Sequence, residues 1–432
     1  MNGSWDNTGK PGLQPGGPAA ASTAGRSAGV GDAGAARVRT LTKMSLLGVM
    51  GVLAATTVVP AELRLASPPA GDYPAAGDPA VTRLLEPIRR KNGVPAMAAA
   101  LVTSKGLVTA GVVGTRKRGA DTAVTLSDRW HLSSDTKAMT ATLLAKLVER
   151  GLLKWNTSMA EVFPDLAPGF GAEARTITVL QLLSHRSGLK AFPDLALYGG
   201  ADGAKERLRL VKDELSRVPT HKPGRQFEYS NLGYCIAGAV AERVVGNTWE
   251  QAMQDEVCGP LEMESVGFGS TGAPGQRDQP WGHGEDGKPA PGNSPVMNNP
   301  PVLSPAVGVH CTIGDWARFI ADQLRGGRGE PALLQAESYR NLHTPTYGGY
   351  YALGWFVVER AWGGGKVLNH AGDSTMNYAN AWLAPRGDFA ILVCINQGGS
   401  RAFHASAEAV NALIRLHAAR TASTEPVERK GS

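Results

Sequence analysis

The sequence predicts an α+β fold in which one antiparallel sheet is built from both chain ends, with flanking helices and a helical lobe inserted in the middle. Strand-like apolar segments occur near residues 97–113 and again after residue 353. Between them, apolar residues recur at helical spacing in several places. We therefore expect a cleft between the sheet and the helical lobe.

The expected strands are short apolar runs bounded by turn residues. An N-terminal pair is formed by residues 97–103 and 107–113, joined across 104–106. A helix from about Ala402 to His417 closes the folded region. The expected C-terminal strands are 353–359, 366–370, 379–383 and 389–395.

The clearest helix follows Ser134. Apolar residues fill its body, Arg150 complements its last turn, and Gly151 suits a left-handed cap. Thr178 and Gln181 match a capping box that opens a shorter helix. Further helices are expected at 230–245 and 315–324, and a long irregular connection lining the cleft is expected at 267–310.

The N-terminal residues resemble an export leader. Gly, Ala, Pro and Ser are frequent before residue 40, and basic residues precede the uncharged segment 44–61. That segment is either a cleaved signal peptide or an N-terminal membrane anchor. We expect an exported protein, periplasmic or extracellular. The chain is predicted to divide into a disordered leader 1–43, the signal or anchor 44–61, a linker 62–77, a folded domain 78–420 and a disordered tail 421–432. Within the folded domain, the sheet is expected from about 78–130 and 350–420, and the helical lobe at about 131–349.

Composition excludes several classes of partner. The chain of 432 residues is 42% hydrophobic and 19% charged, which is typical of a globular protein with a substantial core. Its net charge is +6, but residues 1–43 hold five basic and two acidic residues, so half of the excess lies in the leader. No other basic cluster indicates nucleic acid binding. No metal site, phosphate loop or dinucleotide motif is predicted, so no cofactor is expected.

The four cysteines are scattered along the chain. No Cys-x-x-Cys pair and no zinc-site spacing occurs. Cys235 and Cys394 lie in apolar runs typical of buried thiols. A disulfide between Cys258 and Cys311 stays open if the protein is exported.

The segment Ser134-Asp-Thr-Lys137 carries the predicted chemistry. Three residues apart on a helix, Ser134 and Lys137 share one face, so an amine stands beside a hydroxyl and can manage its proton. The alternative is that Ser134 only caps the helix. A second match to the pattern, Ser187-Gly-Leu-Lys190, is interpreted as a loop because glycine and leucine follow the serine.

The order of further motifs strengthens this interpretation. After the first motif come Leu182-Leu-Ser-His-Arg-Ser-Gly-Leu189, Pro223-Gly-Arg-Gln-Phe-Glu-Tyr-Ser-Asn231 and His370-Ala-Gly372. Together they resemble the serine β-lactamase and penicillin-binding-protein superfamily, most of all the class C β-lactamases with their esterase and D-Ala-D-Ala carboxypeptidase relatives. The resemblance covers residues 78–418 and implies the β-lactamase/transpeptidase-like fold.

The resemblance implies a role for each matching residue. Ser134 is the nucleophile, Lys137 its partner, and Tyr229 and Asn231 a second proton-handling and orienting pair. Two other Tyr-x-Asn matches exist, and only Pro223-Gly224 and the following helix select Tyr229. Whether Lys137 or Tyr229 takes the serine proton stays open, because two such groups shift each other's pKa.

The third motif departs from the family pattern of Lys-Thr-Gly. His370 replaces the lysine, Ala371 replaces the hydroxyl residue, and Gly372 is kept. The family pattern binds a substrate carboxylate through a fixed cation, which a largely neutral histidine does poorly. The resemblance also implies that the backbone N–H groups of Ser134 and Asp373 form the oxyanion hole. His185 is interpreted as structural.

The sequence therefore predicts a serine hydrolase, an esterase or amidase/peptidase, that acts through a covalent acyl-enzyme on a small ester, amide or peptide substrate. A β-lactamase or a D-Ala-D-Ala carboxypeptidase is the alternative among enzymes. The alternative of another class is a penicillin-binding or cell-wall sensor module without turnover. Oligomeric state and the deacylating water's activator are not predicted.

Overall fold

The computed structural model describes residues 75–272, 276–290 and 299–424. The predicted leader and signal segment (1–61) lie outside the described residues, as does most of the linker 62–77. Within the ranges that the structure describes, no helix is both long and apolar enough to cross a membrane.

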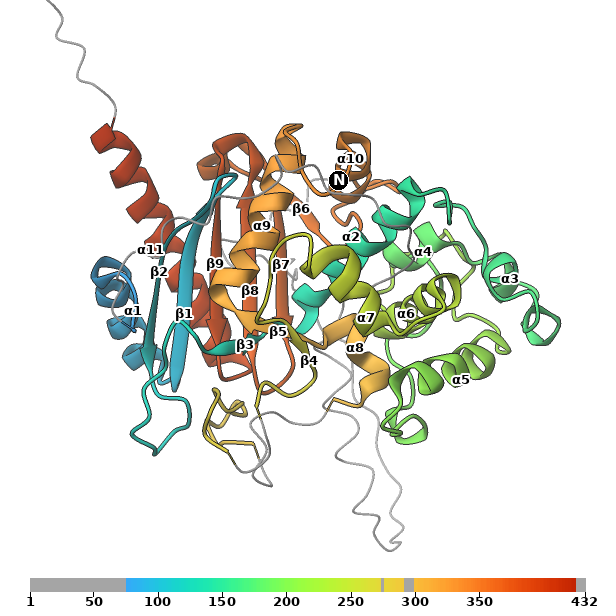
Figure 1. Ribbon diagram of the computed structural model, residues 1–432, viewed down its shortest axis with the longest axis horizontal. Helices are drawn as coiled ribbons and strands as arrows, with labels where there is room; N and C mark the ends of the chain where they lie inside the picture. Colours follow the sequence, from blue (N-terminus) through green and yellow to red (C-terminus); the bar gives the residue numbers. More distant parts are fainter. Residues whose placement is uncertain (1–74, 273–275, 291–298, 425–432) are drawn as a thin grey trace, which may run out of the picture. The chain divides into compact units, whose positions relative to one another are not determined.

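A six-stranded antiparallel sheet forms the centre of the described fold (Figure 1). Its strands are β1 Ala96–Thr103, β2 Gly106–Gly114, β6 Phe356–Arg360, β7 Gly365–Asp373, β8 Tyr378–Ala384 and β9 Phe389–Ile395. In space they follow the order β2-β1-β9-β8-β7-β6. The N-terminal hairpin joins the C-terminal strands where Met97 of β1 lies opposite Ile395 of β9. The predicted sheet built from both ends of the chain is confirmed.

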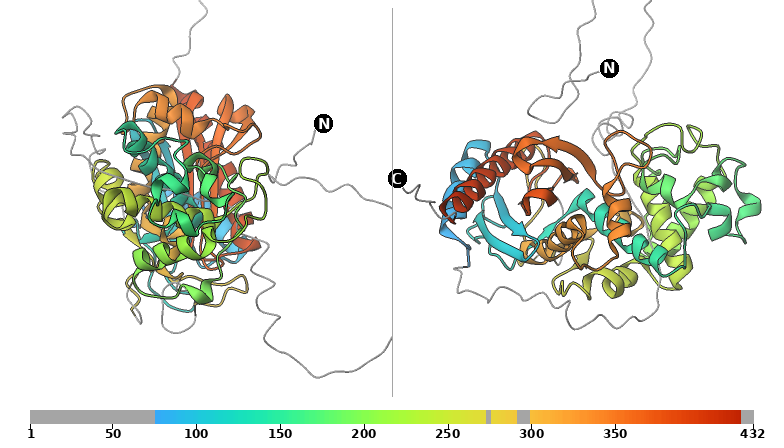
Figure 2. Two further views of the ribbon diagram at one scale, coloured as in Figure 1. Left: turned by 90° about the vertical axis from the view of Figure 1, so that its right-hand side faces the viewer. Right: turned by 90° about the horizontal axis from the view of Figure 1, so that it is seen from above.

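Both faces of this sheet are covered, which explains why its central strands are apolar without interruption. Met97 and Leu101 of β1 point toward the core shared with α1 (Pro79–Asn92) and α11 (Ser400–Thr424). Ala98, between them in the strand, belongs to the core on the opposite face. Figure 2 shows α1 and α11 together on one side of the sheet.

The opposite face of the sheet carries α9 (Ile313–Arg328), which packs on β1 and β2 (Figure 1). Trp316 and Ile320 are buried on its inner side. The sequence analysis assigned residues 131–349, which include α9, to the helical lobe. That assignment is wrong for α9, because the helix packs on the sheet. The apolar stripe of α9 is equally suited to a helix or to a sheet partner, and sequence spacing does not distinguish the two.

The remaining helices follow β2 and precede β6. Thr178 and Gln181 form the predicted capping box, and Gly246 ends α6 in a left-handed conformation. Gly151 follows the helix after Ser134 with a φ of 70°, as predicted. The helices are α2 Thr136–Glu149, α3 Met159–Val162, α4 Val179–Leu183, α5 Gly203–Leu215, α6 Asn231–Val245, α7 Trp249–Met253, α8 Ser304–Val307 and α10 Ala336–His343.

A second, three-stranded sheet lies beside the nucleophile motif. It consists of β3 (Arg129–His131), β5 (Val309–Thr312) and β4 (Gly267–Phe268), in the order β3-β5-β4. The expectation of irregular structure throughout 267–310 is therefore wrong at β4, α8 and the start of β5. The sequence analysis did not recognise these elements because each is only two to four residues long and the segment is rich in Pro and Gly.

The C-terminal helix is longer than expected. It runs to Thr424, so the predicted disordered tail is wrong for residues 421–424, whereas residues 425–432 lie outside the described part. Its last turns are rich in alanine, a strong helix former. Arg420 also forms an ion pair of 2.9 Å with Asp78, the residue that caps α1. A contact between the two ends of the folded chain thus accompanies the extra turns.

All four cysteines are buried and free. The Cys258–Cys311 disulfide that the sequence left open is not formed. Burial raises the pKa of the Cys311 thiol well above its usual value and that of Cys235 to about 12. These thiols therefore behave as small apolar core residues.

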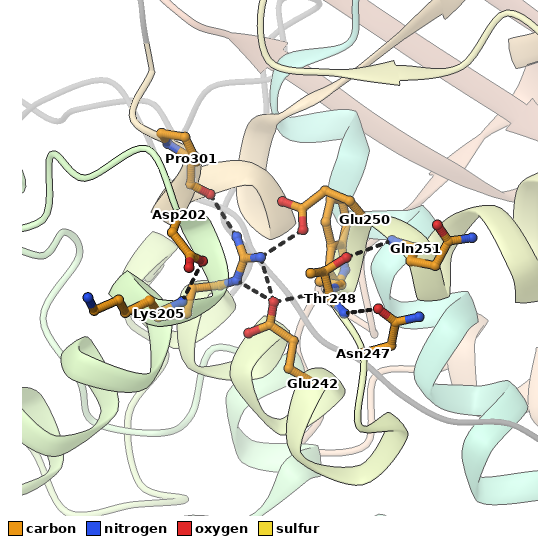
Figure 3. Close-up of polar contacts among 10 residues, drawn as sticks. Asp202, Lys205, Glu242, Asn247, Thr248, Glu250, Gln251 and Pro301 are labelled. Carbon is orange, nitrogen blue, oxygen red and sulfur yellow. Dashed lines mark hydrogen bonds and ion pairs between the residues drawn. The ribbon is translucent and has the colours of Figure 1, made fainter.

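A buried arginine holds three helices around the segment that leads into α8. Arg207 of α5 is fully buried and forms ion pairs with Glu242 of α6 at 2.5 Å and with Glu250 of α7 at 2.8 Å. It also donates to the carbonyl oxygen of Pro301 at 2.7 Å. Figure 3 shows these contacts converging from the two acids and Pro301. The network fixes the chain just before Ser304–Val307, which borders the candidate site.

Candidate active site

Ser134 lies in a short 3-10 turn, Ser133–Asp135, that continues directly into α2. The turn packs against β7 and β8, so the serine is placed where the helical part meets the sheet. Ser134 is 5% exposed. The preceding residue, Ser133, has a φ of 50°, a left-handed conformation that is uncommon for residues other than glycine.

Lys137 lies one helical turn after Ser134, and its amine faces the serine. Its Nζ is 3.1 Å from Ser134 Oγ and donates to the carbonyl oxygen of Ala306 in α8 at 2.5 Å. Lys137 is fully buried, and burial lowers the pKa of its amine well below the usual value, outweighing the attraction of Cys235 and Asp135. The structure therefore favours an uncharged amine beside the hydroxyl.

Tyr229 reaches the same point from the irregular segment before α6. The Ser134 hydroxyl is near enough to lower the pKa of the phenol, although burial is the larger cause and raises it well above its usual value. Tyr229 Oη makes no standard hydrogen bond among the described residues. Its ring stacks on His185, with ring centroids 4.4 Å apart. His185 Nδ1 also accepts from the Ser230 N–H at 3.1 Å, so His185 holds the phenol in place.

We expected Lys137 and Tyr229 to shift each other's pKa. Neither group is among the causes of the other's pKa shift. The amine lies 5.7 Å from the centre of the Tyr229 ring. Burial dominates both shifts and favours the neutral form of each: the free amine and the intact phenol.

Asn231 and His370 contribute polar groups without partners. Asn231 is the first residue of α6, and His370 lies on β7; both are fully buried. Among the described residues, neither the amide atoms of Asn231 nor the ring nitrogens of His370 have a hydrogen-bond partner. Burial lowers the pKa of His370 well below its usual value, so its imidazole is neutral. Buried polar atoms of this kind are available to bind a substrate or water.

Gly372 brings β7 against Ser134. A Cβ on Gly372 would lie 2.5 Å from the Ser134 nitrogen and 2.7 Å from Ser133 Cβ. No larger residue fits there without moving the turn. The carboxylate of the next residue, Asp373, accepts from the N–H of Thr375 in the β7–β8 turn at 2.8 Å and from the N–H of Gly399, just before α11, at 3.0 Å.

The site is enclosed in this structure. Ser134, Lys137, Tyr229, Asn231 and His370 are all buried. A separate cavity of about 700 Å³ lies at the other end of β7, near Gly365, and contains none of these residues. In the described part of the chain, no group of three His, Cys, Asp or Glu side chains is arranged to hold a metal ion.

Comparison with known proteins places this geometry in a family. A family model described as Beta-lactamase matches residues 81–416. The chain belongs to the beta-lactamase family. The matched range includes every residue predicted for the site. Membership in this superfamily of serine hydrolases supports an enzyme of that class.

Curated beta-lactamase family relatives match over part of their length. Protein flp of Staphylococcus aureus strain MW2 is 26% identical over 280 residues, covering 62% of this chain and 53% of flp. Penicillin-binding protein 4 of Amycolatopsis lactamdurans is 32% identical over 178 residues, covering 41% of this chain and 45% of that protein. The chain thus spans about half the length of these curated relatives.

Solved structures share the β-lactamase fold. The octameric penicillin-binding protein homologue from Pyrococcus abyssi has a TM-score of 0.64 at 21% identity, covering 78% of this chain and 77% of its own. D-alanine carboxypeptidase AmpC from Burkholderia cenocepacia has a TM-score of 0.62 at 19% identity, covering 78% and 98%. A class C beta lactamase from Rhodobacter sphaeroides has a TM-score of 0.61 at 18% identity, covering 79% and 100%. The predicted fold is confirmed.

The sequence analysis did not identify two groups that lie next to Ser134 and Lys137. The Ala306 carbonyl that binds the Lys137 amine has no side-chain signature, so no motif marks it. Asp135 is buried between the turn and the sheet, and burial raises the pKa of its carboxyl well above its usual value. The sequence shows that Asp135 directly follows Ser134, but it does not show that Asp135 is buried.

Proposed function

We propose that this beta-lactamase family protein is a serine hydrolase that cleaves uncharged esters or amides of small size through an acyl-enzyme on Ser134. The observation that carries the proposal is the Lys137 amine, 3.1 Å from Ser134 Oγ, with both side chains buried. A serine hydroxyl needs a base to become an effective nucleophile. A buried, uncharged amine at hydrogen-bond distance has the position and protonation state for that role.

In the proposed acylation, Ser134 Oγ bonds to the substrate carbonyl carbon while its proton moves to Lys137 Nζ. The Ala306 carbonyl orients the amine and stabilises the ammonium that forms. The intact phenol of Tyr229 donates its proton to the leaving oxygen or nitrogen as the carbonyl–heteroatom bond breaks. Water then attacks the acyl carbon and gives one proton to the Tyr229 phenolate. The Ser134 ester bond breaks as the Lys137 ammonium returns its proton to Ser134 Oγ, which releases the acid and restores the starting site.

The oxyanion that develops on the substrate needs donors fixed in advance. We propose the backbone N–H groups of Ser134 and Asp373, because Gly372 holds β7 in contact with the Ser134 nitrogen. Losing one donor of this kind costs about 3 to 4 kcal/mol of transition-state stabilisation in well-studied hydrolases. Asn231 supplies unpartnered amide groups that orient the substrate.

The charge of the site supports an uncharged substrate. Where the family pattern has lysine, His370 is neutral and fully buried, and Ala371 has no hydroxyl group. A substrate carboxylate at this position would lose its hydration without gaining a cation, which is unfavourable. We therefore propose that esters are preferred over β-lactams and over peptides that end in D-Ala-D-Ala.

A substrate panel tests this proposal. We expect the purified protein to hydrolyse p-nitrophenyl acetate faster, by kcat/KM, than nitrocefin or a D-Ala-D-Ala peptide, and Ser134→Ala to abolish the activity. Preferred hydrolysis of nitrocefin would contradict the argument from His370 and Ala371. Stable labelling by a fluorescent penicillin without any turnover would favour the penicillin-binding or sensor module.

Export is also proposed, on the basis of the basic residues before segment 44–61 alone. A fusion of residues 1–70 to a reporter that is active only outside the cytoplasm tests it. An inactive, intracellular reporter would reject export.

A further inference from the structure

The residue before the nucleophile has an unusual backbone. Ser133 has a φ of 50°, in the left-handed region, and it is buried. Serine pays a conformational cost there that glycine does not, so surrounding contacts must enforce it. Because Ser133 and Ser134 are adjacent, the dihedral angles of Ser133 determine where the Ser134 N–H points.

His131 supplies the contact that enforces this conformation. The Ser133 N–H donates to His131 Nδ1 at 3.1 Å, and Ser133 Oγ lies 3.2 Å from the same nitrogen. Since Nδ1 accepts the backbone N–H, the neutral ring carries its proton on Nε2. A single ring nitrogen therefore binds both the backbone and the side chain of Ser133.

His131 is itself held rigidly. It lies on β3, opposite His310 of β5, and is 3% exposed. Burial, with a smaller effect of His310, lowers the pKa of His131 to about 3. The ring thus stays neutral, with Nδ1 available as an acceptor, throughout the neutral and mildly acidic pH range.

The other side of the turn is held by β7. A Cβ on Gly372 would lie 2.7 Å from Ser133 Cβ and 2.5 Å from the Ser134 nitrogen, so the turn has no space to relax toward the strand. Hydrogen bonds with His131 and close packing at Gly372 therefore both restrain the two serines.

We propose that His131 is a positioning residue that, through Ser133, holds the Ser134 backbone N–H and hydroxyl in the reactive orientation. The catalytic part of this inference depends on the proposed hydrolase function, whereas the coupling between His131 and Ser133 does not. His131 is distinct from the residues proposed to contact the reacting atoms, because the turn residue to which it is hydrogen-bonded is Ser133.

A kinetic rescue tests the catalytic part. We expect His131→Phe, which keeps a ring and removes the acceptor, to lower kcat for p-nitrophenyl acetate about 100-fold, the scale of losing one oxyanion donor, with little change in KM. Adding Ser133→Gly should restore kcat at least about tenfold, because glycine adopts the positive φ without help. His131→Asn, which keeps an acceptor near Nδ1, should retain most of the activity. A His131→Phe protein with wild-type kcat, or a double variant no better than His131→Phe, would overturn the proposal.

His310 provides the matched control. It is a buried histidine on the neighbouring strand, and its Nδ1 lies 3.3 Å from the carbonyl oxygen of Gly269. We expect His310→Phe to lower the melting temperature with little effect on kcat. A loss of kcat equal to that of His131→Phe would show that any damage to the small sheet has the same effect, and would reject a specific role.

A thermal-unfolding cycle separates failure of this inference from failure of the proposed function. His131→Phe should lower the melting temperature more in the Ser133 background than in the Ser133→Gly background, because the two residues are coupled. Equal shifts in both backgrounds would contradict the coupling. This readout requires no turnover, so it decides the His131–Ser133 link even if the wild type hydrolyses no ester.

Discussion

Gly372 of β7 approaches Ser134 so closely that a Cβ on the glycine would lie 2.5 Å from the serine nitrogen. The nucleophile belongs to the turn before α2, whereas the glycine belongs to the sheet. This close approach therefore joins the turn and the sheet beside the backbone nitrogen of Ser134. Asp373, the residue after Gly372, therefore lies near the Ser134 nitrogen.

We expect Gly372→Ala to lower kcat at least about 100-fold, because the methyl group displaces the proposed oxyanion donors. The variant should also lose about 1 to 3 kcal/mol of unfolding free energy through overpacking. Ester hydrolysis and urea unfolding measure the two effects. Gly199→Ala is the control, since an added Cβ there meets no atom within 4 Å. Equal kinetics for both variants would contradict the proposed geometry.

Lys137→Met should abolish hydrolysis and raise stability by about 1 to 2 kcal/mol near neutral pH, because it removes a buried ionisable group kept for function. The native pKa of Lys137 lies below its usual 10.5, so between these two pH values the unfolded chain binds the additional proton. Wild-type stability should therefore fall as the pH is lowered through that window and level off below the native pKa. Urea unfolding at several pH values should show the advantage of Lys137→Met growing as the pH falls; an advantage independent of pH would contradict a buried neutral amine.

Two tyrosine variants should have opposite effects. Tyr229→Phe removes a buried hydroxyl without a standard hydrogen bond, so we expect about 1 kcal/mol of added stability together with a kcat about 100-fold lower or worse. Tyr339→Phe removes the hydrogen bond to Asp322, so stability should fall by about 2 kcal/mol while hydrolysis is retained. Thermal unfolding and ester kinetics on both proteins provide the comparison. An active Tyr229→Phe protein would remove the phenol from the mechanism.

Arg207→Met should destabilise the fold by about 3 kcal/mol, because it leaves Glu242 and Glu250 without their buried cation. Since Arg207 also binds the Pro301 carbonyl ahead of α8, the position of Ala306 and thus of the Lys137 amine should become less defined. Urea unfolding measures the first effect and kcat the second. Arg243→Met, which breaks a solvent-exposed pair with Asp165, is the control and should change both quantities little.

The sequence was sufficient for the residues whose spacing or order is itself the signal. Ser134 and Lys137 fall one helical turn apart, and the strand segments at both ends predict one sheet because both are apolar and bounded by turns. Tyr229 needed its flanking Pro223-Gly224 to be distinguished from other Tyr-x-Asn matches. These features are local in the sequence, so they can be recognised without a structure.

The sequence was insufficient where distant backbone atoms meet. The Ala306 carbonyl has no side-chain pattern, and the positive φ of Ser133 has no marker because serine, not glycine, occupies the position. The packing of α9 on the sheet depends on which apolar surface is nearest in space. His131 has a role only once β3 and the turn are seen together.

The most direct test of the central claim is the mass of the protein trapped by acid during turnover of p-nitrophenyl acetate. The account predicts a species heavier by one acetyl group, with the modification mapping to the peptide that contains Ser134 and absent from Ser134→Ala. An acetyl group found only on another residue, or hydrolysis that continues unchanged in Ser134→Ala, would contradict it.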